Sequence, residues 1–212
     1  MNIAAASTAT ESLGPGFRAV IWVQGCPLNC RGCVAPEWIP IQPQRLVSPA
    51  DLATELLAGP AVDGLTLSGG EPMLQARALA ELVRRVRLET AVTVICFTGF
   101  TLARLRSAPP GPGVDELLSE IDVLVDGPYV AARDDGRGLR GSTNQVVHHL
   151  TDELRDCGYD FEHRVRSAEL HVDERSVTLV GIPPHGLLAT LDSVLGDRPE
   201  SFDDRDPEQL DR

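Results

Sequence analysis

Four short apolar runs, each followed by a loop and a stretch with helical spacing, set the expected architecture of this 212-residue chain. They occupy residues 18–23, 63–70, 91–97 and 121–129. Strands that are separated by helices pair in parallel, because each crossover returns the chain to the same edge of the sheet. The sequence therefore predicts an α/β fold with mostly parallel strands. A partial (β/α) barrel is expected, because a complete eightfold barrel needs about 250 residues.

The stretches between the runs carry helix signals. Helices are expected over residues 48–59, 73–89, 101–107 and 114–119. The first is the best delimited, because Ser48 can cap its N-terminus, Pro49 suits the first turn and Gly59 can end it. In parallel sheets the chemistry collects at the carboxyl ends of the strands, so the loops after the four runs are the expected place for a site.

The chain is expected to divide into three parts. Residues 1–150 form the barrel domain, and residues 151–196 form a C-terminal extension packed on it, with a small β-hairpin over 168–181. Residues 197–212 are acidic and poor in apolar side chains, which predicts disorder. Residues 1–16 are interpreted as a short, partly disordered lead-in.

The composition limits the classes of partner and the cellular compartment that can be expected. The net charge is −12 and the chain has no lysine, which argues against nucleic acid and anionic membranes as partners, since both need a basic face. No apolar run reaches the ~20 residues of a membrane span, and the N-terminus lacks the features of a signal peptide. An odd count of five cysteines predicts reduced thiols, hence a cytoplasmic protein.

Three of the five cysteines lie in one loop after the first run, in the sequence "GCPLNCRGC". Their spacing is Cys26-x3-Cys30-x2-Cys33, and thiolates this close together suit zinc or an iron–sulfur cluster. Structural zinc sites usually take four ligands as two pairs, and no second pair is present. Cys96 lies in the middle of a predicted strand, where a buried role is expected, and Cys157 has no neighbouring cysteine.

Two alternatives to an iron–sulfur site remain at this point. The three cysteines could be unrelated buried residues, or a zinc ion could recruit His148, His149 or His163. On a cubane cluster, three cysteines leave one iron without a protein ligand. An open coordination position is what allows a metal site to bind substrate or cofactor directly.

A second motif, "SGGEP" at residues 68–72, follows the second run. Gly69 and Gly70 allow a backbone to approach a ligand closely, and Glu71 can accept charge-assisted hydrogen bonds from an ammonium group. The plainer reading is a glycine turn before a helix, with Glu71 and Pro72 in its first turn.

Together, the cysteine spacing after the first strand and "SGGEP" after the second resemble the signature of the radical S-adenosylmethionine superfamily. The resemblance implies a 4Fe-4S cluster whose unique iron chelates S-adenosylmethionine. One electron then cleaves the sulfonium to methionine and a 5′-deoxyadenosyl radical, which abstracts a hydrogen atom. In such an enzyme the cofactors carry the chemistry and the protein holds and orients them.

Further stretches narrow the resemblance: "GPGFR", "FTGF", "VDGPY" and "RGSTNQ". Over about residues 12 to 147 the chain is similar to the activating proteins of anaerobic ribonucleotide reductases and related glycyl-radical-enzyme activases. This implies a radical oxidoreductase with a glycyl-radical enzyme as partner and reduced ferredoxin or flavodoxin as electron donor. The alternatives are the same chemistry on a peptide or small metabolite, or a non-catalytic iron–sulfur or zinc-binding module.

The resemblance also assigns roles to individual residues. The cluster ligands would be Cys26, Cys30 and Cys33. The contacts near the adenine of S-adenosylmethionine would be Gly32 and Val34, and those at its methionyl end Gly69, Gly70 and Glu71. Thr98 and Asp126 would lie near the cofactor carboxylate, with a monovalent cation between them, although Asp126 could equally be a turn residue of Asp-Gly-Pro.

Overall fold

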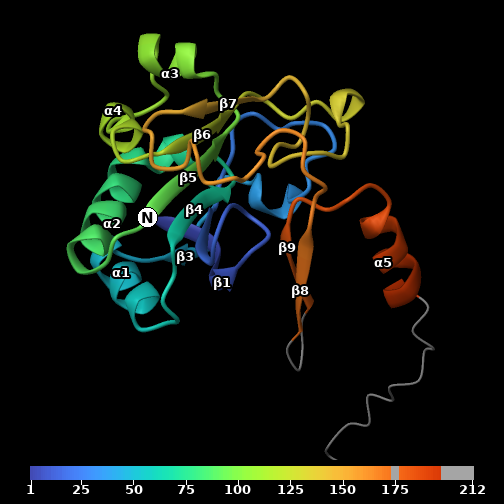
Figure 1. The fold of residues 1–212 in the computed structure, drawn as a ribbon, viewed down its shortest axis with the longest axis horizontal. Helices are drawn as coiled ribbons and strands as arrows, with labels where there is room; N and C mark the ends of the chain where they lie inside the picture. The colour runs from blue at the N-terminus through green and yellow to red at the C-terminus, as the bar shows by residue number, and fades with distance from the viewer. Residues whose placement is uncertain (173–176, 197–212) are drawn as a thin grey trace, which may run out of the picture.

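The computed structural model describes residues 1–172 and 177–196 (Figure 1). Four parallel strands form the centre of one sheet: β2 (Arg18–Val23), β4 (Gly64–Gly69), β5 (Thr93–Thr98) and β6 (Val123–Asp126). They coincide with the four apolar runs, so the α/β class with a mostly parallel sheet is confirmed. The sheet has seven strands in all. Its two edge strands do not pair with each other within the described residues, and a barrel is not confirmed.

Three further strands widen the sheet. These are β1 (Asn2–Thr10), β3 (Arg45–Leu46) and β7 (Val146–His149). β1 pairs antiparallel with β2 and β3, and β7 pairs antiparallel with β6, giving the order β3-β1-β2-β4-β5-β6-β7. The expected disordered lead-in over residues 1–16 is therefore wrong. The small, weakly apolar residues of β1 carry little strand signal, and pairing with β2 decides their conformation.

The predicted helices are present, with small changes at their ends. They are α1 (Pro49–Leu57), the 3₁₀ turn η2 (Pro72–Gln75), α2 (Ala76–Glu89), α3 (Leu102–Ser107) and α4 (Val114–Leu118); two more 3₁₀ turns are η1 (Pro36–Trp38) and η3 (Ala131–Arg133). Ser48 caps α1 by accepting a hydrogen bond from the Asp51 N–H at 3.1 Å. Among the described residues, no helix combines the length and apolar character needed to cross a bilayer.

The two faces of the sheet are buried by different parts of the chain. On β2, Ile21 and Val23 point to the face covered by α1 and α2, whereas Val20 and Trp22 point to the opposite face. Residues from beyond position 150, among them Leu154, Phe161 and Val180, cover that second face. In Figure 1, α1, α2 and α4 accordingly lie on one side of the sheet and the C-terminal elements on the other.

The C-terminal extension contains β8 (Ala168–Val172), β9 (Val177–Gly181) and α5 (Leu187–Gly196). β8 and β9 pair antiparallel, which confirms the predicted hairpin, although its turn at residues 173–176 lies outside the described residues. The predicted disordered tail over 197–212 also lies outside them. The hairpin is joined to the end of β1, because Thr10 donates a hydrogen bond to Glu169 at 2.8 Å.

Arg18, the first residue of β2, is a buried cation. Its guanidinium donates to the hydroxyls of Thr66 at 2.8 Å and Thr93 at 3.0 Å, and to backbone carbonyls of the same strands. Burial lowers the pKa of Arg18 to about 10, which still leaves it charged at neutral pH. A Cβ built at Gly14 would lie 2.7 Å from its Cδ, and one at Gly64 would lie 2.4 Å from its Nη1, so two glycines make room for this side chain.

Candidate functional site

The predicted site residues lie at the carboxyl ends of the four parallel strands. The cysteine loop follows Val23 at the end of β2, and Gly69 pairs with Val23 at the end of β4. Thr98 pairs with Asp126 where β5 and β6 end. Stretches that are 100 residues apart in the sequence thus meet at one edge of the sheet.

The cysteine loop holds three free thiols, on Cys26, Cys30 and Cys33, and each residue is half-buried. Two residues between them have left-handed backbone conformations, Asn29 with φ 47° and Gly32 with φ 80°. Asparagine and glycine tolerate this conformation better than other residues. The loop therefore turns sharply twice between the cysteines.

The environment of the thiols acts on their pKa in two directions. Burial raises the pKa of Cys26 and Cys33 above the usual value, because a thiolate is poorly solvated there. Backbone hydrogen bonds from Leu28 and Asn29 to Cys26, and from Ala35 to Cys33, oppose this by stabilising the thiolate. Hydrogen bonds of this kind also tune the reduction potential of iron–sulfur clusters.

The donor set fits a cubane cluster better than a single metal ion. Within residues 1–172 and 177–196, no three His, Cys, Asp or Glu side chains converge as ligands of one ion would. In a cubane each thiolate binds a different iron, so the sulfurs stay further apart than around one ion. Three free thiols in one partly exposed loop, with backbone donors directed at them, suit that arrangement.

The segment after the third cysteine folds back over the loop. The Gly25 N–H donates to the Trp38 carbonyl and the Cys26 N–H donates to the Ile39 carbonyl, each at 2.9 Å. The Trp38 ring packs on Trp22 with their centroids 5.6 Å apart. This strap, residues 34–44, was not predicted from the sequence, because its contacts are made by backbone groups. It fixes the first cysteine against the end of β2.

The glycine pair of "SGGEP" is required by packing of backbone on backbone. A Cβ at Gly69 would lie 2.5 Å from the Val23 nitrogen, and one at Gly70 would lie 2.4 Å from the Gly25 oxygen. The Gly70 N–H donates to the Val23 carbonyl at 2.7 Å. The close approach expected at these glycines is thus made by the start of the cysteine loop, and a contact with S-adenosylmethionine stays a prediction.

Glu71 is buried, with 1% of its surface exposed. Its Oε1 accepts hydrogen bonds from the Met73 N–H at 2.9 Å and the Thr98 hydroxyl at 2.8 Å, and its Oε2 accepts one from the Gly99 N–H at 2.9 Å. Burial raises its pKa to about 6, while these three donors lower it. Glu71 therefore caps η2 and joins the ends of β4 and β5. A carboxylate has about four acceptor positions, so one is left for a further donor.

Asp126 is also buried at the end of its strand. Its Oδ2 accepts a hydrogen bond from the Leu102 N–H at 2.5 Å, at the start of α3, and lies 2.9 Å from His148 Nε2. The carboxylate thus holds a helix terminus, a structural role alongside the predicted cofactor contact. The pairing with His148 could not be foreseen, because it depends on β7 pairing with β6.

Gly32 and Val34 flank the third cysteine. Val34 is 54% exposed, which leaves an apolar surface beside Cys33. A Cβ at Gly32 would lie 3.6 Å from Cε1 of Tyr129, so the loop lies against that ring. Tyr129 is part of the "VDGPY" stretch, but no role was assigned to it from the sequence. Gln24 was missed altogether, although its side chain donates to the Pro40 carbonyl at 2.8 Å and so holds the strap.

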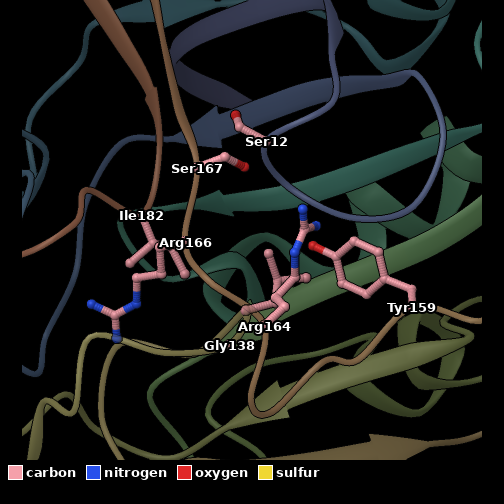
Figure 2. Close-up of a pocket in the computed structure, with 8 residues that line it drawn as sticks. Ser12, Gly138, Tyr159, Arg164, Arg166, Ser167 and Ile182 are labelled. Carbon is pink, nitrogen blue, oxygen red and sulfur yellow. The ribbon is translucent and has the colours of Figure 1, made fainter.

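The two other cysteines lie outside the loop, whereas the candidate zinc ligand His148 contacts Asp126 at this edge. Cys96 is fully buried in the core between the sheet and the helices, as expected. Cys157 is exposed. A small cavity of about 10 Å³ lies between the extension and the domain, but none of the predicted site residues lines it (Figure 2). That volume is near the ~10–15 Å³ that one enclosed water needs.

A parallel α/β sheet whose first central strand ends in a three-cysteine loop defines an iron–sulfur protein with one cluster. Residues 12–148 match the family model described as "4Fe-4S single cluster domain", and the chain belongs to that family. The match covers the sheet except for β1, together with the cysteine loop and the glycine motif. It ends at β7, so the C-terminal extension lies beyond it.

The chain is similar to proteins named "Anaerobic ribonucleoside-triphosphate reductase-activating protein". The one from Vibrio cholerae serotype O1 is 38% identical over 149 residues, covering 65% of this chain and 91% of the relative. The one from Escherichia coli K12 is 32% identical over 145 residues, with the same coverage. A "Putative glycyl-radical enzyme activating enzyme" of Haemophilus influenzae is 37% identical over 90 residues, covering 41% of this chain and 34% of the relative. The resemblance seen in the motifs is thus confirmed.

Proposed function

We propose that this chain is a radical S-adenosylmethionine enzyme that installs a glycyl radical on a partner enzyme of the anaerobic ribonucleotide reductase type. The observation that carries the proposal is the loop of three free cysteines at the strand ends, in a chain whose relatives are named activating proteins of that reductase. When bound, the 4Fe-4S cluster supplies one electron to S-adenosylmethionine, which yields methionine and a 5′-deoxyadenosyl radical able to take a glycine hydrogen atom.

The cysteine loop would hold the cluster. Cys26, Cys30 and Cys33 would each bind one iron and leave the fourth open to S-adenosylmethionine. The half-buried position of the three thiols supports this, because a small molecule can reach them from solvent. Burial raises the pKa of Cys26 and Cys33, and the backbone donors at both residues would partly offset this in favour of the thiolate form that binds iron.

The neighbouring strand ends would orient S-adenosylmethionine. The remaining acceptor position of Glu71 would bind its ammonium group, beside the backbone of Gly69 and Gly70. The exposed Val34 and the open backbone of Gly32 would contact the adenine. Thr98 and Asp126 would lie near the carboxylate, with a monovalent cation between them. The electron would come from reduced ferredoxin or flavodoxin.

Anaerobic reconstitution tests the site. The wild-type chain is expected to turn brown, to bind about four irons, and to form 5′-deoxyadenosine from S-adenosylmethionine in the presence of dithionite. Cys30→Ala should abolish both iron binding and deoxyadenosine formation. Cys157→Ser is the matched control, because Cys157 is exposed and lies outside the loop, and it should behave as wild type. A colourless zinc protein, or deoxyadenosine formation by Cys30→Ala, would overturn the assignment.

The partner is tested separately. The reconstituted chain is mixed with the anaerobic ribonucleotide reductase from the same genome, dithionite and S-adenosylmethionine. Electron paramagnetic resonance should then show a glycyl radical on the reductase, and Cys30→Ala should give none. Deoxyadenosine formation without a glycyl radical would reject this partner and favour a peptide or small metabolite as the hydrogen donor.

A further inference from the structure

We propose that the C-terminal extension positions the cysteine loop, through a chain of contacts that runs from Arg166 to Asp134 to Tyr129 to Gly32. Arg166 and Tyr129 are in this view positioning residues for the cluster. The inference rests on the proposed function only in that the cysteine loop is taken to hold the cluster. It assigns a task to a part of the chain that lies beyond the family match at residues 12–148.

At the loop, the ring of Tyr129 lies beside Gly32 together with Ala131, and its other edge lies close against Gly141. A Cβ at Gly32 would lie 3.6 Å from Cε1 on one edge of the ring, and a Cβ at Gly141 would lie 2.8 Å from Cδ2 on the opposite edge. Gly32 lies between the second and third cysteines. The position of this ring therefore limits where the loop can move.

The Tyr129 ring is itself held by its hydroxyl. Its oxygen lies 3.3 Å from Asp134 Oδ2, to which it donates a hydrogen bond. The other carboxylate oxygen, Oδ1, accepts from the Gly136 N–H at 2.9 Å and lies 2.8 Å from Arg166 Nη2. His185 Nε2 also lies 3.2 Å from Oδ1, and a carboxylate with four such partners has a fixed orientation. Asp134 thus connects the tyrosine to the arginine.

Arg166 brings the extension into this chain of contacts. Its side chain is only 2% exposed, and Nη2 also donates to the carbonyls of Arg140 at 2.6 Å and Gly141 at 3.2 Å. The guanidinium therefore holds both Asp134 and the backbone that touches Tyr129. Arg166 is also one of the residues that line the small cavity of Figure 2, and its guanidinium points away from Arg164 and Tyr159.

These contacts complement the strap described above. Trp38 and Ile39 fix the loop at its first cysteine, and Tyr129 supports it near its last. A loop that holds a redox cluster benefits from support at both ends, because the geometry and hydrogen bonding of the ligands set the potential.

The test compares Arg166→Gln and Tyr129→Phe in the full-length chain. Hydrogen exchange of peptides covering residues 26–35 is measured before and after anaerobic reconstitution, and the reduction potential is measured on the loaded protein. Both variants are expected to exchange about tenfold faster in the loop, since each loses a hydrogen bond to a charged group. Both should also shift the potential and broaden the resonance of the reduced cluster.

Arg155→Gln is the matched control. It removes an exposed ion pair with Asp152 in the same extension, which makes no contact with Tyr129 or Asp134, so the loop should exchange as in wild type. Faster exchange confined to the extension in Arg166→Gln, with an unchanged loop in Tyr129→Phe, would overturn the proposal. Tyr129→Phe keeps the ring and removes only the hydroxyl. If Arg166→Gln does not fold, the exchange rate of the loop in Tyr129→Phe tests the proposal alone. Hydrogen exchange of the metal-free protein tests the positioning role even if no cluster binds. A failure of the proposed function would instead appear as a failure of reconstitution.

Discussion

Glu71 shows how one side chain can serve the fold and the proposed site together. It is buried at the end of β4 and accepts three hydrogen bonds, two of them from residues at the end of β5. The three donors stabilise the carboxylate, but burial outweighs them and its pKa rises to about 6. A carboxyl whose pKa is higher in the folded than in the unfolded chain binds its proton more tightly when folded. Its contribution to stability is therefore present at low pH and lost as the pH rises through the folded pKa.

The upward shift of the Glu71 pKa predicts how the stability of the fold depends on pH. Between pH 4.5 and pH 7, the contribution of Glu71 to the free energy of unfolding should fall by about 2 kcal/mol, at ~1.36 kcal/mol per pKa unit. Urea denaturation of the wild-type chain and of Glu71→Gln at several pH values measures it, because the difference between the two chains removes the effect of all other groups. A difference that stays constant over this range would contradict the shifted pKa.

The strap over residues 34–44 is the element that gives the cysteine loop its shape. It contributes no predicted cluster ligand, yet its carbonyls accept from two successive N–H groups at the start of the loop, and Trp38 anchors it on Trp22. An aromatic pair of this kind is worth about 0.5–1.5 kcal/mol beyond its buried area. The loop therefore depends on a ring that lies outside the motif.

Trp38→Ala is expected to loosen the strap without removing a cysteine. The reconstituted variant should lose iron to a chelator about tenfold faster than wild type, which corresponds to ~1.4 kcal/mol. The loss of absorbance of the brown protein follows the rate. Trp38→Phe keeps a ring against Trp22, so its rate of iron loss should lie between those of wild type and Trp38→Ala. Equal rates in all three proteins would show that the strap does not support the cluster loop.

The elements that sequence reasoning found differ from those it missed in what stabilises them. The four central strands are buried on both faces and are therefore apolar runs, and α1 carries its own cap at Ser48. β1, β3 and β7 are held by antiparallel pairing with other strands of the sheet, which their own residue patterns do not report. The same holds at the site. The cysteines and "SGGEP" are visible as spacing, whereas Tyr129 and His148 gain their neighbours only through the fold.

The C-terminal extension and the preceding domain share a hydrophobic core on one face of the sheet. Leu154, Phe161 and Val180 of the C-terminal part pack with Val20 and Trp22 on the face of the sheet that the helices leave free. Large apolar side chains in such a core carry much of the stability of a domain. The extension and the family domain are therefore expected to unfold together.

Phe161→Ala tests this shared stability. Phe161 is 5% exposed and packs edge-on against His149 with centroids 5.2 Å apart, so its loss should lower the free energy of unfolding by about 3–5 kcal/mol. Both tryptophans lie in the first 40 residues, yet their fluorescence should shift to lower urea in a single transition. Phe17→Ala, at a side chain that is 50% exposed, should cost under about 1 kcal/mol. Two separate transitions would show that the parts are independent.

The buried Arg18 has a consequence for how sequences of this fold can diverge. Its guanidinium fills the volume that side chains at Gly14 and Gly64 would need, and it provides the hydrogen bonds for Thr66 and Thr93. Replacing either glycine alone causes a collision with the arginine, and replacing the arginine alone leaves a hollow lined with hydroxyl and carbonyl oxygens that have lost a donor. Each single step is thus disfavoured, whereas a joint exchange of Arg18 and Gly64 for apolar residues removes their collision. These positions are expected to vary together across evolution, as one linked unit.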